Sequence, residues 1–337
     1  METQTYILLL DKTVEAEKIN QIAIQHNFKK DEERENFYFW KGQEYKSIKG
    51  CYFSFGHNFN LSNFTDETVP YDMICATSTE PGCSYDDREK QIKIMETIQN
   101  LYGGKIYDPN ENSWGIRGNT LPKLSKTEIA CGIEYVEFRI DLNEEINSIQ
   151  EVDLSKTYFD WSTKKSIYPR SLIDNHSIVT QLVTLFETFL KNFFKKYLQT
   201  NKSAYEKFIA DYVPKRDIKP RKKLTHEQKF KYHLRQYTFQ NLKSVQTAYE
   251  KYLNYNLEEV LNVELIHRGE ITTIGKALRP ILNKRHGKIH ENVYDLELNK
   301  EKTKQYCDVI KTFCSTFIDK FMEKNNYKLL IEYELGY

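Results

Sequence analysis

The pattern of hydrophobic and polar positions divides the chain into two halves of different character. In the first half, short apolar runs at Tyr6–Leu10, Phe37–Trp40, Cys51–Phe55 and Met73–Ala76 predict buried strands. A fifth strand is predicted at Tyr135–Leu142, where apolar and charged residues alternate.

Two amphipathic helices are predicted among these strands. One follows Thr13, and the other covers Asp86–Leu101 and ends before Gly103-Gly104. Strands interleaved with helices predict a small mixed α/β sheet layer in the first half of the chain.

From Ile173 onward, apolar residues recur every three or four positions, and no further strand is predicted before the C-terminal end. We therefore expect an α+β protein, with a mixed α/β sheet domain over residues 1–165 and an all-α bundle over residues 166–337. The predicted helices are His176–Tyr197, Ser203–Tyr212, Thr225–Val260 with interruptions, Thr273–Asn283 and Lys300–Lys324, and Tyr327–Leu335 is a candidate for a final strand.

Composition and charge narrow the class of protein without naming a ligand. Apolar residues make up 39% and charged residues 29% of the 337 residues, as in soluble globular proteins. Lys and Arg number 49 against 48 Asp and Glu, so a nucleic-acid partner would have to meet a local basic patch. The N-terminal residues lack the features of a signal peptide, and no apolar run reaches the roughly 18 residues that span a bilayer. We expect a cytoplasmic protein that does not contact membranes.

The cysteines and carboxylates give no sign of a metal or cofactor. The six cysteines contain no C-x-x-C pair, and Cys307 and Cys314 lie seven apart in a helical pattern. This spacing favours reduced, buried structural thiols over a zinc site or disulfides. No cluster of carboxylates suggests a metal site, so no metal and no cofactor is expected.

The candidate chemistry comes from arginine and histidine at short spacing. Four pairs match Arg-x4–6-His, so spacing alone has little weight. Only the Arg285–His290 run follows a predicted helix, contains Gly287, where we expect the helix to break, and precedes a long closing helix. The other three pairs are Arg170 with His176, expected to be a capping or surface residue, Arg221 with His226 at a helix start, and Arg279 with His286.

The arrangement of these segments resembles the HEPN superfamily over roughly residues 170–325. A long first helix with Phe186-Glu187-x-x-Leu190 is followed by Asn283-Lys284-Arg285-His286-x-x-Ile289-His290 and a C-terminal amphipathic helix. This resemblance implies a metal-independent endoribonuclease. His290 would transfer a proton, Arg285 would bind the phosphate, and His286 would orient or support them. A family variant that is nucleotidylated on a tyrosine two residues after the second histidine is not matched, since Asn292 stands there.

The same resemblance implies partners. HEPN domains usually act as dimers that bring two motifs together, so a homodimer through the helical domain is expected, with RNA as the substrate. Around the motif, Arg279, Lys284, Lys288 and Asn292 are candidates for RNA contacts. The basic segment Lys215–Arg235 is either a second phosphate-binding patch or a solvated loop.

Two further interpretations stay open. By analogy with two-domain defence proteins, the first domain could be a sensor or regulator, and the protein an abortive-infection or toxin effector with an antitoxin or a phage trigger. Alternatively, Arg285 and His290 only pair with a carboxylate such as Glu291 or Asp295 at a helix end. The helical domain would then be a non-catalytic HEPN-like module that binds a nucleotide or a partner, or an unrelated helical domain.

Overall fold

The computed structural model describes residues 3–10, 14–57, 73–213, 224–291 and 294–328, with the backbone alone for residues 285–291. The described chain forms two compact units, one ending at Ile129 and the other beginning at Ala130, and each is considered by itself. Within these ranges, no helix combines the length and the apolar character needed to cross a membrane.

The first unit is built on a seven-stranded sheet in which every neighbouring pair is antiparallel, in the order β2-β3-β4-β5-β1-β6-β7. The runs predicted as strands are confirmed as β1, β3, β4 and β5. The short connection between β3 and β4 joins neighbouring antiparallel strands, whereas β1 pairs with β5 and β6 from later in the chain. The strands are β1 (Gln4–Leu10), β2 (Lys29–Lys30), β3 (Phe37–Trp40), β4 (Cys51–Gly56), β5 (Met73–Thr79), β6 (Lys105–Asp108) and β7 (Ser113–Trp114).

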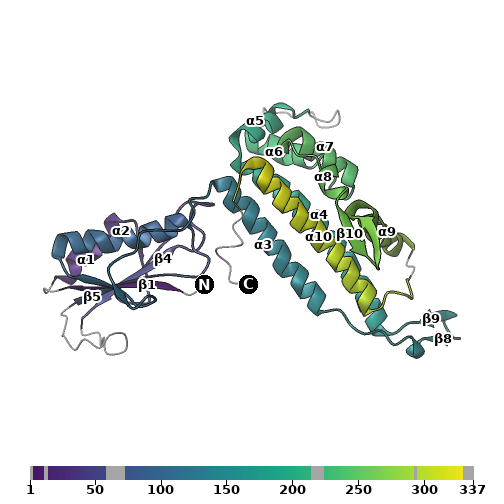
Figure 1. Cartoon of the computed structure of the whole chain (residues 1–337), viewed down its shortest axis with the longest axis horizontal. Helices are drawn as coiled ribbons and strands as arrows, with labels where there is room; N and C mark the ends of the chain where they lie inside the picture. The colour runs from purple at the N-terminus through teal and green to yellow at the C-terminus, as the bar shows by residue number, and fades with distance from the viewer. Residues whose placement is uncertain (1–2, 11–13, 58–72, 214–223, 292–293, 329–337) are drawn as a thin grey trace. The chain divides into compact units, whose positions relative to one another are not determined.

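Helices α1 (Ala16–Gln25) and α2 (Tyr85–Tyr102) cover one face of this sheet (Figure 1). Their apolar stripes pack against alternate strand residues such as Leu8 and Phe53, both fully buried. The N-terminus of α2 is fixed by Asp87, whose buried carboxylate accepts hydrogen bonds from the backbone N–H groups of Ile48 and Lys49, at 3.0 Å each, and from the Ser47 hydroxyl. One carboxylate thus joins the loop before β4 to the helix.

The second unit is helical, as predicted, and its long helices α3, α4 and α10 run alongside one another (Figure 1). Two short hairpins, β8–β9 and β10–β11, interrupt the helices. The elements are α3 (Lys126–Asn147), a 3-10 turn (Leu154–Lys156), β8 (Tyr158–Asp160), β9 (Lys165–Ile167), α4 (Arg170–Thr200), α5 (Lys202–Ala210), α6 (His226–Leu234), α7 (Leu242–Leu253), α8 (Glu258–Leu261), β10 (Glu264–His267), β11 (Glu270–Thr273), α9 (Ile274–Glu291) and α10 (Lys300–Asn325).

The core of the helical unit consists largely of phenylalanine rings from α4 and α10. Phe193 meets Phe317 and Phe321 edge to face, with ring centroids 4.9 and 5.0 Å apart, and Phe186 meets Phe313 at 5.0 Å. Edge-to-face pairs of this kind add to the stabilisation from burial alone. The spacing of these rings along each helix produces the apolar stripes visible in the sequence.

The strand predicted at Tyr135–Leu142 is wrong, because this segment lies within α3. Its buried residues Cys131, Tyr135, Phe138 and Leu142 recur every three or four positions, whereas Ile140 is only partly buried. The apparent alternation was a fragment of the longer helical repeat. Because α3 continues into the helical unit, the division falls after Ile129, ahead of the boundary expected at residue 165.

The expectation of no further strands after Ile173 is also wrong. The β10–β11 hairpin turns through Arg268 and Gly269, with φ angles of 56° and 79°, as a tight two-residue turn requires. The final strand suggested at Tyr327–Leu335 lies outside the described residues from position 329 onward.

Candidate functional site

Helix α9 carries the Arg-x4-His motif. Ile274, Leu278 and Ile281 are fully buried, and α9 packs against α4 and α10. The helix continues through Gly287 to Glu291, so the break predicted at this glycine is wrong. A glycine inside a helix costs about 1 kcal/mol relative to alanine, which the packing of the buried face can outweigh.

The backbone fixes how the motif positions are distributed around α9. Arg285 and His290 are five residues apart on a continuous helix, so their Cα atoms lie about 140° apart around the axis. His286 and His290 are four apart, so their Cα atoms lie on the same side. The side chains of Arg285, His286, Lys288 and His290 are outside the described atoms, and so is all of Asn292.

The loop that follows the motif is held by a cluster of charges around Asp295. Its carboxylate pairs with Lys284, the residue before Arg285, and with Lys302 of α10 at 3.2 Å. Burial acts to raise the pKa of Asp295, but hydrogen bonds from Lys284, the Glu297 backbone and Lys302 outweigh it and hold the pKa at about 2. Lys284, expected to bind RNA, therefore has a protein carboxylate as its partner.

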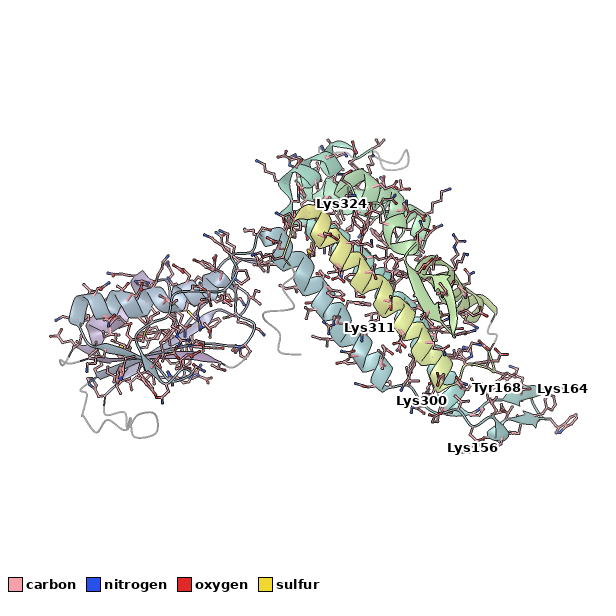
Figure 2. All side chains as sticks on the ribbon, viewed as in Figure 1. Lys156, Lys164, Tyr168, Lys300, Lys311 and Lys324 are labelled. Carbon is pink, nitrogen blue, oxygen red and sulfur yellow. The ribbon has the colours of Figure 1, made fainter. Side chains whose placement is uncertain are left out.

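Helix α4 anchors the same loop from the other side. The Asp295 N–H donates to Nε2 of His176 over 2.9 Å, and the His176 ring meets the Tyr294 ring edge to face at 5.2 Å. Tyr294 also contacts Tyr168, which lies just beyond the β8–β9 hairpin and is labelled in Figure 2. The neighbouring Asn175 is fully buried and donates to the backbone carbonyl of Gln150 over 2.9 Å.

These contacts change the interpretation of His176. It was expected at a cap or on the surface, but it is only 6% exposed, and it binds a backbone 119 positions further along the chain. Its counterpart Arg170 has an 83% exposed side chain paired with Asp174. Arg170 therefore belongs to a surface ion pair, whereas His176 is buried and holds the loop at Asp295.

The remaining candidates are placed as follows. Arg279 is exposed on α9, two turns before the motif, and has no ion pair among the described residues. The helix start expected at Thr225 is confirmed. Thr225 is the N-cap of α6, which begins at His226, and it forms a capping box with Gln228. Residues 214–223 of the basic segment are outside the described chain, while Lys231 and Arg235 are exposed on and just after α6. In the part of the chain that the structure describes, no group of three His, Cys, Asp or Glu side chains could hold a metal ion.

The sequence suggested Asp295 only as a partner of Arg285 or His290, and it did not predict the residues that Asp295 contacts. The partners of Asp295 come from α9 and α10, and His176 comes from α4, so only the fold brings them together. The one available signal was the presence of Asn175 and His176 within an otherwise apolar stripe, a pattern typical of buried polar residues with specific partners.

Comparison with known proteins gives one match. The family model described as RiboL-PSP-HEPN matches residues 137–323, which is more than half of the chain and includes most of the helical unit. Searches of curated proteins and of solved structures found no match.

Proposed function

Because the chain belongs to the RiboL-PSP-HEPN family, we propose that its helical unit is a metal-independent endoribonuclease. The family supports a nuclease-like or RNA-related function, and cleavage by this chain is our proposal. The observation that carries it is the position of Arg285, His286 and His290 in the last turns of α9, directly before the loop anchored by Asp295 and His176.

The proposed reaction needs no group beyond the protein and the RNA. The 2′-hydroxyl oxygen attacks the adjacent phosphorus and forms a P–O2′ bond while the P–O5′ bond breaks. The products are a 2′,3′-cyclic phosphate and a 5′-hydroxyl. One histidine accepts the 2′ proton, a second group donates a proton to O5′, and Arg285 offsets the charge growing on phosphorus. We assign the proton transfer to His290 and the supporting role to His286.

A homodimer is part of the proposal. One chain has its Arg285 and His290 backbone positions on different sides of α9, so a single helix presents an incomplete site. A second copy related by a two-fold axis would supply the complementary positions.

The biological role is a further part of the proposal. We propose that this cytoplasmic nuclease acts as a toxin or abortive-infection effector, with the first unit as its sensor. An antitoxin would hold it inactive, or a phage trigger would activate it. Expression of the wild-type chain should arrest growth, and Arg285→Ala should relieve the arrest. Growth arrest that persists in this variant would contradict an effector role based on RNA cleavage.

The alternative function is a non-catalytic HEPN-like module that binds a nucleotide or a partner. The separation of Arg285 and His290 around α9 favours it if the chain acts alone. Both functions predict binding, and only the first predicts new RNA ends.

The deciding experiment incubates the purified full chain with transfer and messenger RNA in EDTA and maps the products. We expect cleavage with 2′,3′-cyclic phosphate ends, lost in Arg285→Ala and His290→Ala and reduced in His286→Ala. The competing Arg/His pairs provide matched controls, because Arg170 and His226 are exposed and lie on α4 and α6. Arg170→Ala and His226→Ala should cut RNA like the wild type.

Each outcome decides the proposal. Absence of cleavage by a folded wild-type dimer favours the binding module. Cleavage that persists in both motif variants removes the site assignment, and cleavage that requires added metal ions overturns the metal-independent mechanism. Circular dichroism of each variant separates loss of chemistry from loss of folding.

A further inference from the structure

An open groove of about 960 Å³ runs between α7, α8 and α9 of the helical unit. We call it the α7–α9 groove. Its walls include Gln240, which precedes α7, and Lys243 at the start of α7. On α9 they include Lys276, Arg279 and Asn283. It therefore follows the same helix that carries the motif.

The charges in this groove favour an anion. Lys243, Lys276 and Arg279 are exposed, and none of them has a carboxylate partner within the described ranges. The two acidic residues of the groove are each bonded to a side-chain amide: Gln246 donates to Glu250 over 2.8 Å, and Asn262 donates to Glu258 over 3.4 Å. The groove thus holds three cations against two carboxylates, and within the described residues neither carboxylate forms an ion pair with them, so the cations can bind phosphates.

Side-chain amides accompany these cations. Gln240 and Asn283 line the groove, and neither side chain makes a hydrogen bond among the residues described. An amide both donates and accepts, which suits the edges of unpaired bases. In an RNA duplex these edges are occupied by pairing or lie in a groove too narrow for side chains. The groove therefore fits a single strand better than a duplex.

A second groove, of about 890 Å³, lies between α4 and α6, and its lining has four cations, Lys191, Lys195, Lys231 and Arg235, against the two carboxylates Glu187 and Glu227. We call it the α4–α6 groove. Gln240 lines both grooves, so the two adjoin at this residue. Together they form an extended surface rich in cations that ends on α9.

The geometry of α9 connects this surface to the motif. Lys276, Arg279 and Asn283 follow one another at spacings of three and four, which places them on one stripe of the helix. From Arg279, the axial rise to the end of the motif is about 16 Å along the same helix. A strand lying over this stripe is directed toward the C-terminal end of α9.

We propose that the α7–α9 and α4–α6 grooves form one binding site for a single-stranded RNA segment, and that this site directs the strand to the motif on α9. This inference rests on the proposed function for its substrate. It assigns positioning roles to Lys276 and Arg279, which lie before the motif.

The test measures binding of the full chain to a fluorescent 2′-O-methyl RNA oligonucleotide, which lacks the free 2′-hydroxyl and is not cleaved. The test variant is Lys276→Gln/Arg279→Gln. The matched control is Lys304→Gln/Lys311→Gln, with the same charge loss at exposed positions of α10, where Figure 2 labels Lys311. We expect the test variant to bind at least about tenfold more weakly, and the slope of log Kd against log salt to fall by about 1.4, because each phosphate contact to a single strand contributes about 0.7.

A duplex of the same sequence forms the second arm and should bind at least about tenfold more weakly than the single strand. Equal binding of the duplex overturns the single-strand assignment. Equal binding by the test variant, the control and the wild type overturns the groove itself.

Cleavage kinetics keep this proposal separate from the proposed function. If the wild type cuts RNA, the test variant should raise KM for a long substrate and leave kcat nearly unchanged. A wild-type chain that binds RNA through the groove but cuts nothing would refute the nuclease and leave the groove in place. A chain that cuts RNA through Arg285 and His290, with KM unchanged in the test variant, would refute the groove alone.

Discussion

Replacement of Asp295 by asparagine removes a negative charge that joins the end of α9 to α10 and keeps the shape of the side chain. The carboxylate is 20% exposed, and it pairs with Lys284 and with Lys302, whose side chain is 14% exposed. Asparagine can accept hydrogen bonds but offers neither lysine a counter-charge. We expect the loop after the motif to open more often.

The magnitude follows from the pKa of Asp295, which lies at about 2 instead of the usual 3.8. One pKa unit corresponds to about 1.36 kcal/mol, which gives roughly 2 kcal/mol, and solvent screening reduces it to about 1–2 kcal/mol. Because the pKa is lowered in the folded state, this stabilisation is present above pH 3.8 and is lost as the pH falls through 2.

Hydrogen exchange measured by mass spectrometry on peptides spanning residues 294–310 tests this expectation. At pH 7, Asp295→Asn should exchange about 5–30 times faster than the wild type, since about 1.4 kcal/mol corresponds to a factor of ten. Urea unfolding should show the difference in stability shrinking from pH 5 toward pH 2.

Glu297→Gln is the matched control, because Glu297 bonds Lys302 at 2.8 Å but is 84% exposed. It should change the exchange rate little. Equal effects of the two substitutions, or a stability difference that does not depend on pH, would refute the reasoning that the partly buried Asp295 carboxylate fixes this loop.

Three other substitutions or modifications test the two units. Asp87→Ala leaves the hydrogen-bond donors around this carboxylate unpaired and should lower the free energy of unfolding of the first unit by about 2–4 kcal/mol in urea titrations. The control Asp86→Ala should lower it by under about 1 kcal/mol, and equal losses would contradict the assigned role of Asp87. Phe317→Ala should destabilise the helical unit by about 3–5 kcal/mol, and a smaller loss would mean that the phenylalanine core repacks easily. Burial raises the pKa of Cys307 to about 12 and also raises the pKa of Cys314, so neither thiol should react with a thiol reagent at pH 8 in the folded chain. Fast labelling would show that α10 opens.

The elements predicted best from the sequence are those with a complete apolar repeat. Lys300–Lys324 is confirmed as α10, and Asp86–Leu101 as α2, because each helix buries one face over several turns. Cys307 and Cys314, expected to face the core, are both fully buried there. Where the local apolar pattern and the burial in the fold agree over many residues, the sequence alone is enough to predict the helix.

Segments with short or ambiguous patterns were predicted poorly. The alternation in Tyr135–Leu142 fits a strand over eight residues, and only the wider spacing from Cys131 to Leu142 identifies the helix. The β10–β11 hairpin is equally hard to predict, because Ile266 and Ile271 are 76% and 75% exposed and show no buried face. Both errors arise because the pattern of a few residues does not show which face of the segment packs against the core.

The candidate site also has a part that the sequence predicts and a part that it does not. The motif itself is local and could be found from Arg285 to His290, but its supports are not. The Asp295 cluster and the His176 anchor depend on contacts between α4, α9 and α10, which no local pattern contains. Asn175 and His176 could have been suspected of making such contacts, because they interrupt the apolar stripe of α4 and a buried polar atom requires a partner.

The proposed dimer leads to the sharpest test of the motif. Arg285 and His290 occupy backbone positions about 140° apart on α9, so a site within one chain is hard to assemble, whereas a two-fold axis can place Arg285 of one copy beside His290 of the other. Arg285→Ala and His290→Ala should each be inactive as pure dimers. Unfolding and refolding an equal mixture should restore about a quarter of the wild-type activity, since half of the dimers are mixed and each of these holds one intact site.

Each homodimer refolded alone is the control for this experiment. Recovered cleavage in the mixture means that the two residues act across the interface. If the mixture stays inactive although mixed dimers form, each site must take both residues from the same chain. In that case either the long Arg285 side chain would have to reach around α9, or the helix would have to change direction near Gly287, to bring the two groups together on one phosphate.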